Sequence, residues 1–183
     1  MRTADADIII VPGHGNSGPE HWQTRWEQKL GSARRVAQAD WSKPDFKDWQ
    51  ENVVRAAEAA TRPAILVAHS LGVITVVHAA KRLAGTKVKG AFLVAPPGET
   101  YMVEHEEIDL KFADVPRDPL PFPSVLVASR NDPYCPHLEA EEWAYAWGAA
   151  FSDAGESGHI NTDSGHGPWP EGLMRFAGFL AKL

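Results

Sequence analysis

The stretch AILVAHSLG, residues 64–72, joins an apolar run to a helical pattern with no loop between them. Its first five residues predict a buried strand, and residues 71–83, which are rich in valine and alanine, predict a helix. Ser70 stands where the strand has to turn sharply into the helix. Small residues two positions before and after it, Ala68 and Gly72, allow the strand and the helix to approach closely. The stretch therefore predicts a strand-turn-helix unit with a serine exposed at the carboxyl end of the strand.

This turn has the spacing of the pattern G-x-S-x-G, in which a serine on a strained strand-to-helix turn serves as a nucleophile. Alanine replaces the first glycine here and is also small. The N–H of Leu71 and the amino end of the helix would then face a negative charge that develops beside Ser70. The alternative interpretation is a serine that caps an ordinary helix. The nucleophile interpretation is favoured over the helix cap only if the chain also supplies residues that can activate the serine.

Apolar runs alternate with helical patterns along the whole chain of 183 residues. Short, continuously apolar strands separated by helices indicate a parallel sheet covered on both faces. The fold class expected is therefore α/β, a doubly wound, mostly parallel sheet of about six strands in the order 2-1-3-4-5-6, in one domain over residues 1–183. The expected strands are 8–11, 35–39, 64–68, 89–95, 123–129 and 148–152, and the expected helices are 20–30, 45–61, 71–83, 137–147 and 171–183.

A glycine-rich turn follows the first expected strand, in IIIVPGHGNSG at residues 8–18. Gly13, Gly15 and Gly18 have the spacing G-x-G-x-x-G, and Asp40 follows near where a ribose-binding acid would lie. A Rossmann-like protein that binds a dinucleotide through GHGNSG is therefore one interpretation. The prolines that directly precede the first glycine and follow the third weigh against it.

The other interpretation makes the same loop an oxyanion-binding loop. In proteins with a nucleophilic serine on such a turn, the second oxyanion donor comes from the loop after a neighbouring central strand. The glycines would let backbone N–H groups approach a substrate oxygen. The N–H of His14 is the first choice as donor, with Asn16 and Ser17 as alternates.

A serine nucleophile needs a base, and the base needs an acid that orients it. Asp132 lies just past the carboxyl end of the expected strand 123–129, in a turn stiffened by Pro133, and His159 lies in a loop after the last expected strand. Ser70, Asp132 and His159 thus occur in the chain order serine, acid, histidine, each after a strand. Taken singly, Asp132 fits a simple turn and His159 a surface loop; together they predict a catalytic triad.

Further residues are expected around this site. His166 is a rival base, and it could instead line the site. His69 adjoins the nucleophile, but its side chain is expected to point away and to hydrogen-bond beneath the site. The expected pocket residues are Asn16, Ser17, His69, His166 and Trp169. Residues 98–122 show no clear pattern and are interpreted either as a lid or as an irregular crossover loop.

These residues predict a serine hydrolase that cleaves a small ester or amide through an acyl-enzyme on Ser70, without a cofactor or metal. The eight histidines are scattered, and HEEID at 105–109 breaks the zinc pattern H-E-x-x-H. A binding module on a catalytically inactive hydrolase fold is a third alternative, and the intact triad weighs against it.

Composition excludes several other classes. The net charge is −6 and no basic cluster occurs, so no nucleic-acid partner is expected. No apolar run approaches membrane-spanning length, and the amino terminus lacks the features of a signal peptide, so no membrane association is expected. The single cysteine, Cys135, excludes an internal disulfide and favours a cytoplasmic location. No sequence feature specifies an oligomeric state.

Four stretches together, VPGHGNSGPEHWQTRWE, LVAHSLG, ASRNDPYC and SGHINTDSGHGPWPEG, span most of the chain. In them the chain resembles the small α/β-hydrolase-fold serine hydrolases related to retinoblastoma-binding protein nine and its bacterial relatives. The resemblance implies a hydrolase core with minimal or no cap and a triad of Ser70, Asp132 and His159. The retinoblastoma-binding pattern Leu-x-Cys-x-Glu is absent, so that binding role is not carried over.

Overall fold

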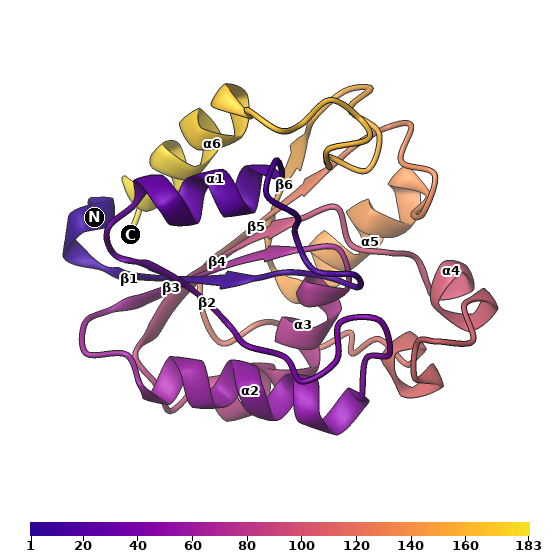
Figure 1. Ribbon diagram of the computed structural model, residues 1–183, viewed down its shortest axis with the longest axis horizontal. Coiled ribbons are helices and arrows are strands. Elements are labelled where there is room, and N and C mark those ends of the chain that lie inside the picture. The colour runs from indigo at the N-terminus through magenta and orange to yellow at the C-terminus, as the bar shows by residue number, and fades with distance from the viewer.

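A parallel sheet of six strands runs through the computed structural model, which describes residues 1–183 (Figure 1). The strand order is β2-β1-β3-β4-β5-β6 and all neighbouring strands are parallel, which confirms the predicted doubly wound order. The strands are β1 (Asp7–Val11), β2 (Ala33–Arg35), β3 (Ala64–His69), β4 (Val88–Val94), β5 (Ser124–Ala128) and β6 (Ala150–Asp153). The central strands are buried along almost their whole length, as their unbroken apolar runs require.

The position of the second strand was predicted wrongly. It covers Ala33–Arg35, not residues 35–39. The last hydrogen bond of its ladder runs from the N–H of Val36 to the carbonyl of Ile10. The next bond would need an N–H on Pro12, which proline lacks. The chain therefore leaves the sheet before it can use the apolar residues that suggested a strand further on.

Helices cover both faces of the sheet (Figure 1). On one face, α1 and α6 enclose a core cluster that contains Trp22, Trp26 and Phe176. On the other face, α2, α3 and α5 enclose a larger cluster that contains Trp49 and Trp143. The helices are α1 (Trp22–Lys29), α2 (Phe46–Glu58), α3 (Leu71–Leu83), α4 (Glu99–Glu104), α5 (His137–Trp147) and α6 (Pro170–Leu180). No helix combines the length and the apolar character needed to cross a membrane.

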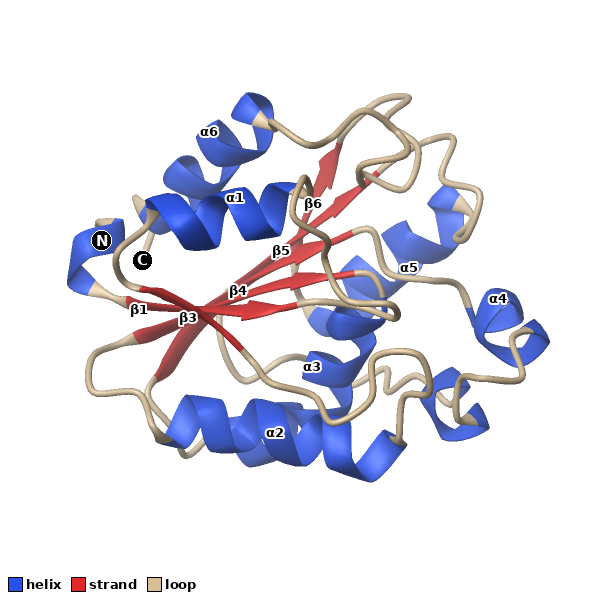
Figure 2. Ribbon diagram, viewed as in Figure 1, coloured by secondary structure: helices blue, strands red, loops and turns tan.

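Residues 98–122, expected to lack a clear pattern, contain α4 and a short 3-10 helix at Leu110–Ala113. The part of this segment that contains α4 lies beyond the carboxyl ends of the strands (Figure 2), and the chain then returns to the amino end of the parallel strand β5. The buried side chains of Met102 and Phe112 anchor it to the larger core cluster. The N–H of Glu99 also bonds to the Glu139 carboxylate on α5. The segment is therefore a packed wall beside the sheet edge.

The carboxyl end of β1 packs directly against the turn between β3 and α3. A Cβ atom at Gly72 would lie 2.6 Å from the carbonyl oxygen of Pro12, and closer still to that of Val11. A Cβ atom at Gly13 would lie 2.7 Å from the Cβ of Ser70. Real Cβ atoms do not approach this closely, so both positions require glycine. This contact fixes the loop after β1 against the serine turn.

Replacement of Gly72 by alanine is expected to lower the free energy of unfolding, measured by urea denaturation, by about 1–3 kcal/mol or more, because backbone must move to admit the methyl group. The matched control is Gly178→Ala in α6, where a Cβ would meet nothing within 4 Å. That change is expected to be neutral or to stabilise by up to about 1 kcal/mol, since alanine favours a helix over glycine. Equal stability of the two variants would contradict the packing argument.

Candidate active site

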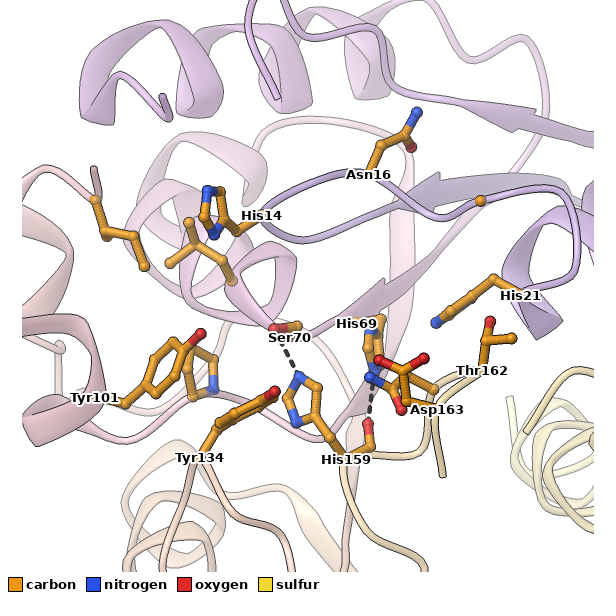
Figure 3. A pocket seen from close by; sticks show the side chains of 15 residues that line it. His14, Asn16, His21, His69, Ser70, Tyr101, Tyr134, His159, Thr162 and Asp163 are labelled. Atoms are coloured by element: carbon orange, nitrogen blue, oxygen red, sulfur yellow. Dashed lines mark hydrogen bonds between the residues drawn. The ribbon is translucent and has the colours of Figure 1, made fainter. Parts of the chain in front are cut away.

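Three side chains from three loops form one hydrogen-bonded chain at the carboxyl edge of the sheet. Nε2 of His159 lies 2.9 Å from Oγ of Ser70 (Figure 3). Nδ1 of His159 lies 2.9 Å from Oδ2 and 3.1 Å from Oδ1 of Asp132. Because a carboxylate only accepts hydrogen bonds, Nδ1 carries the proton and Nε2 accepts from the serine hydroxyl. The histidine and aspartate side chains are only 7% and 3% exposed, so little solvent reaches this pair.

The backbone of Ser70 is strained, with φ of 55° and ψ of −131°. A left-handed φ is unfavourable for serine, and such strain is typical of functional sites. The N–H of Ser70 is held by the carbonyl of Val94 on β4. The hydroxyl makes no capping bond to α3, so the interpretation of Ser70 as an ordinary helix cap is wrong.

Two residues of the cavity lining have a backbone N–H without an acceptor in the protein. Leu71 begins α3, and neither its N–H nor that of His14 donates a hydrogen bond within the protein. Both residues line the cavity that contains Ser70. A Cβ at Gly13 would lie only 3.0 Å from the N atom of Leu71, which shows how closely the loop after β1 approaches the amino end of α3. The ring of His14 is tied to the Ser42 carbonyl through Nε2.

Buried polar groups hold this loop in place. The side chain of Gln23, fully buried on α1, donates to the carbonyl of Val11 at the end of β1 and to that of Val67 within β3. Its Oε1 accepts from Oγ of Ser17 at 2.6 Å. Arg35 donates to the side chain of Asn16 and to the carbonyl of Ser17. Ser17 is thus a buried part of the scaffold and does not line the cavity.

The geometry of the loop does not favour a dinucleotide. A pyrophosphate-binding loop opens directly into a helix whose amino end holds the phosphates. Here α1 begins only at Trp22, capped by the buried His21. Asp40, the expected ribose ligand, instead bonds within its own turn to Ser42 and Lys43. The first glycine, Gly13, faces the serine turn.

A cavity of about 290 Å³ opens around Ser70. Figure 3 shows Tyr101 and Tyr134 on one side of the serine and His21, Thr162 and Asp163 on the other. Asp163 is the only carboxylate among the lining residues, and no lysine or arginine is among them. The lining residues are His14, Asn16, Gly18, His21, His69, Ser70, Leu71, Pro97, Tyr101, Ile108, Tyr134, His159, Asn161, Thr162 and Asp163.

The expected pocket residues divide into two groups. Asn16 and His69 line the cavity, whereas Ser17, His166 and Trp169 do not. Trp169 is 5% exposed and packs against Trp22 and Trp26, so its placement in the pocket was wrong. A loop position made it look accessible, but its ring completes the core under α1 and α6. His166 bonds instead within its own loop, to Ser164 and the Asn161 carbonyl.

Several residues that line the cavity, among them Tyr101, Ile108 and Tyr134, were not predicted from the sequence. Tyr134 stands edge-on to the His159 ring, with ring centroids 4.5 Å apart, and Tyr101 packs against Tyr134. Tyr134 follows Asp132 so closely that its position after a strand end was an available signal. Tyr101 and Ile108 lie in the segment without a clear pattern, and no local signal marks them.

Two further buried histidines, His69 and His21, lie behind His159. The Nε2–H of His69 donates to the carbonyl of His159 at 2.9 Å, as expected for a side chain beneath the site. The ring of His21 packs edge-on against His69. Burial, followed by the nearby His21 and His159, holds the pKa of His69 well below its usual value. Burial, with Arg35 as the next cause, lowers the pKa of His21 to about 3. Both rings are therefore neutral at neutral pH.

Comparison with known proteins agrees with this geometry. The family described as serine hydrolase matches residues 8–178. The chain belongs to this serine hydrolase family. Its hydrolase fold agrees with the resemblance to small α/β-hydrolase-fold enzymes inferred from the sequence. No curated protein matches this serine hydrolase.

Solved structures share its fold. A YdeN-like hydrolase from Pectobacterium atrosepticum is 34% identical, with a TM-score of 0.85, over 97% of this chain and 91% of that one. The ydeN gene product of B. subtilis is 19% identical, with a TM-score of 0.71, over 95% and 98% of the two chains. An esterase domain of a Rhodothermus marinus protein is 14% identical, with a TM-score of 0.66, over 92% and 84%. The last two similarities show the fold alone.

The buried His21 predicts a loss of stability in mild acid. An unfolded histidine titrates near pH 6.5, whereas the folded pKa of His21 is about 3. Between pH 6.5 and pH 3 the unfolded state therefore binds a proton at His21 that the folded state does not bind. The free energy of unfolding falls as the pH drops through this range. At pH 5 this single group is expected to cost about 2 kcal/mol.

The variant His21→Asn tests this prediction, because asparagine can still accept the N–H of Gln23 that His21 now caps. Urea unfolding at pH 8 and pH 5 gives the acid-induced loss for each protein. The wild type is expected to lose about 2 kcal/mol more than the variant. An identical loss in both proteins would show that His21 does not carry the effect.

Proposed function

We propose that this serine hydrolase cleaves small esters or amides through a covalent acyl-enzyme on Ser70. The observation that carries the proposal is the continuous chain of hydrogen bonds from Ser70 through His159 to Asp132. A serine is a weak nucleophile by itself, and an adjacent imidazole held by a carboxylate is the arrangement that activates it. The family and the fold support hydrolysis as the type of reaction.

The proposed reaction has two steps. His159 takes the hydroxyl proton at Nε2 as Oγ of Ser70 attacks the substrate carbonyl carbon, and Asp132 stabilises the imidazolium that forms. The imidazolium then gives its proton to the leaving oxygen or nitrogen, and the bond to the leaving group breaks. In the second step His159 deprotonates a water molecule, which attacks the acyl carbon. The imidazolium then returns the proton to Oγ of Ser70 as the acyl–Oγ bond breaks, which releases the acid and regenerates free Ser70 and neutral His159. The proposed steps need no cofactor.

The N–H groups of Leu71 and His14 are the proposed oxyanion donors. Neither has an acceptor within the protein, and both line the cavity beside Ser70. Donors that are fixed before the reaction stabilise the charge that develops on the carbonyl oxygen at no cost in reorganisation. The close approach enforced at Gly13 supports a role for both groups at one oxygen atom.

The cavity constrains the substrate. Its volume of about 290 Å³ suits a small substrate or one small part of a larger one. The two tyrosines form an aromatic wall that also carries hydroxyl groups, and the opposite wall is polar. Because Asp163 is the only carboxylate and no basic side chain lines the cavity, neutral or cationic substrates are favoured over anionic ones.

Labelling with a fluorophosphonate probe tests the nucleophile. The wild type is expected to gain one adduct in its intact mass, and folded Ser70→Ala protein none, because the probe reacts with an activated serine. Ester hydrolysis by the variant is expected to fall by at least about 10³-fold. Circular dichroism confirms that the variant is folded. Unchanged turnover by folded Ser70→Ala protein would remove Ser70 from the mechanism.

The two candidate bases can be separated by substitution. His159→Ala is expected to lower kcat for p-nitrophenyl acetate by about 10²–10⁴-fold, the usual contribution of a general base. His166→Ala is expected to stay close to wild type, because His166 bonds within its own loop. Steady-state kinetics of both purified variants provide the comparison. The reverse ranking would make His166 the base.

A further inference from the structure

The acid and the base of the proposed triad lie on separate loops, after β5 and after β6. We infer that Ser129 and Asn131 are positioning residues that join these two loops and so set the contact between Asp132 and His159. The inference rests on the proposed function, because it assigns these residues a part in the same reaction. Neither residue lines the cavity.

The loop that carries His159 is held partly by its own hydrogen bonds and partly by bonds to neighbouring loops. It follows an edge strand of four residues and has no regular secondary structure between β6 and α6. Three of its residues around His159 have left-handed backbone angles, Gly155 with φ of 67°, Gly158 with 55° and Ile160 with 48°. For isoleucine this conformation is strained, so other parts of the protein have to impose it.

Two side chains of the loop after β5, which carries Asp132, accept hydrogen bonds from the loop after β6, which carries His159. Oγ of Ser129 accepts the N–H of Ser157 at 2.8 Å, and Oδ1 of Asn131 accepts the N–H of Gly158 at 2.8 Å. The hydroxyl of Ser129 in turn lies 2.8 Å from Oδ1 of Asn131, so the two acceptors form one unit. Ser129 is 1% exposed, which leaves water little access to this bond.

These bonds can affect the proposed triad because the residues that form them adjoin its acid and its base in the sequence. Asn131 directly precedes Asp132, and Gly158 directly precedes His159. One hydrogen bond of 2.8 Å thus joins the residue before the acid to the residue before the base. Other bonds act on the far side of the base, where Trp22 holds the Ile160 carbonyl and His69 holds that of His159. The N–H of Arg130 also joins the two loops, at the carbonyl of Gly155, whereas the Ser129–Asn131 unit bonds to the two residues directly before His159. A displacement of about 1 Å at such a contact can cost about 10²-fold in rate.

Two alanine variants, Ser129→Ala and Asn131→Ala, test the inference. Each is expected to lower kcat for p-nitrophenyl acetate by about 10- to 100-fold with little change in KM, because the cavity is untouched while the base moves. Asn131→Asp keeps the acceptor oxygen and is expected to restore most of the rate. The matched control is Asn52→Ala on α2, which removes a side-chain bond to Gln38 away from the site and is expected to leave kcat unchanged.

A second readout does not depend on activity. A histidine N–H held by a carboxylate gives a proton NMR signal at unusually low field, and Asp132→Ala assigns it by its loss. The signal is expected in the wild type, Asn131→Asp and Asn52→Ala, and is expected to broaden or disappear in both Ser129→Ala and Asn131→Ala. If either variant fails to fold, the other carries the test.

The outcomes separate the two proposals. An unchanged NMR signal and unchanged kcat in folded Ser129→Ala and Asn131→Ala would overturn the positioning role. Equal losses of kcat in the Asn52→Ala control would overturn it as well, because the effect would then follow general destabilisation. If the wild type shows no turnover that depends on Ser70, the proposed function fails, and the NMR signal still decides whether the two loops are held by Ser129 and Asn131.

Discussion

The backbone contact between the end of β1 and the turn after β3 is the constraint on which the rest of the site depends. Gly72 and Gly13 have no room for a side chain because carbonyl groups and the Ser70 turn occupy it. This contact forces the serine into its strained conformation and brings the loop after β1 beside the amino end of α3. Leu71 and His14, whose N–H groups have no acceptor in the protein, both line the cavity that contains Ser70. Steric exclusion at two glycines thus allows the loop after β1 and the serine turn to lie against each other.

A second layer of polar groups fixes the loops that this contact leaves free. Gln23 and Arg35 hold the loop after β1, whereas His69 and Trp22 hold the loop of His159. Each of these bonds is made largely out of contact with solvent. Buried polar groups of this kind are costly unless they are paired, so they favour one arrangement of the loops strongly over others. The arrangement that they favour is the one in which Ser70 and Asp132 both reach His159.

The fold and the triad geometry could be anticipated because their signals are local. The central strands are mostly apolar runs, and Ser70, Asp132 and His159 each follow a strand within a few residues, so the shared edge of a parallel sheet brings them together. The second strand could not be placed, because its end depends on a missing N–H at Pro12, the residue that follows its partner strand β1. Trp169 was assigned to the pocket for a similar reason: only its packing against Trp22 and Trp26 shows that it belongs to the core. Ser129 and Asn131 look like ordinary turn residues until the loop after β6 is placed beside them.

The two outer strands have a consequence for the behaviour of the protein at high concentration. An open sheet can add strands from another chain along its edges, which is a common route to aggregation. Here β2 spans only three residues, and two of them are arginines. At the other edge β6 spans four residues, and the Arg175 guanidinium donates a hydrogen bond to the carbonyl of Asp153. Because both edge strands are short and carry or contact arginine side chains, another strand finds few free backbone groups to pair with. The open sheet is therefore protected against edge-to-edge aggregation.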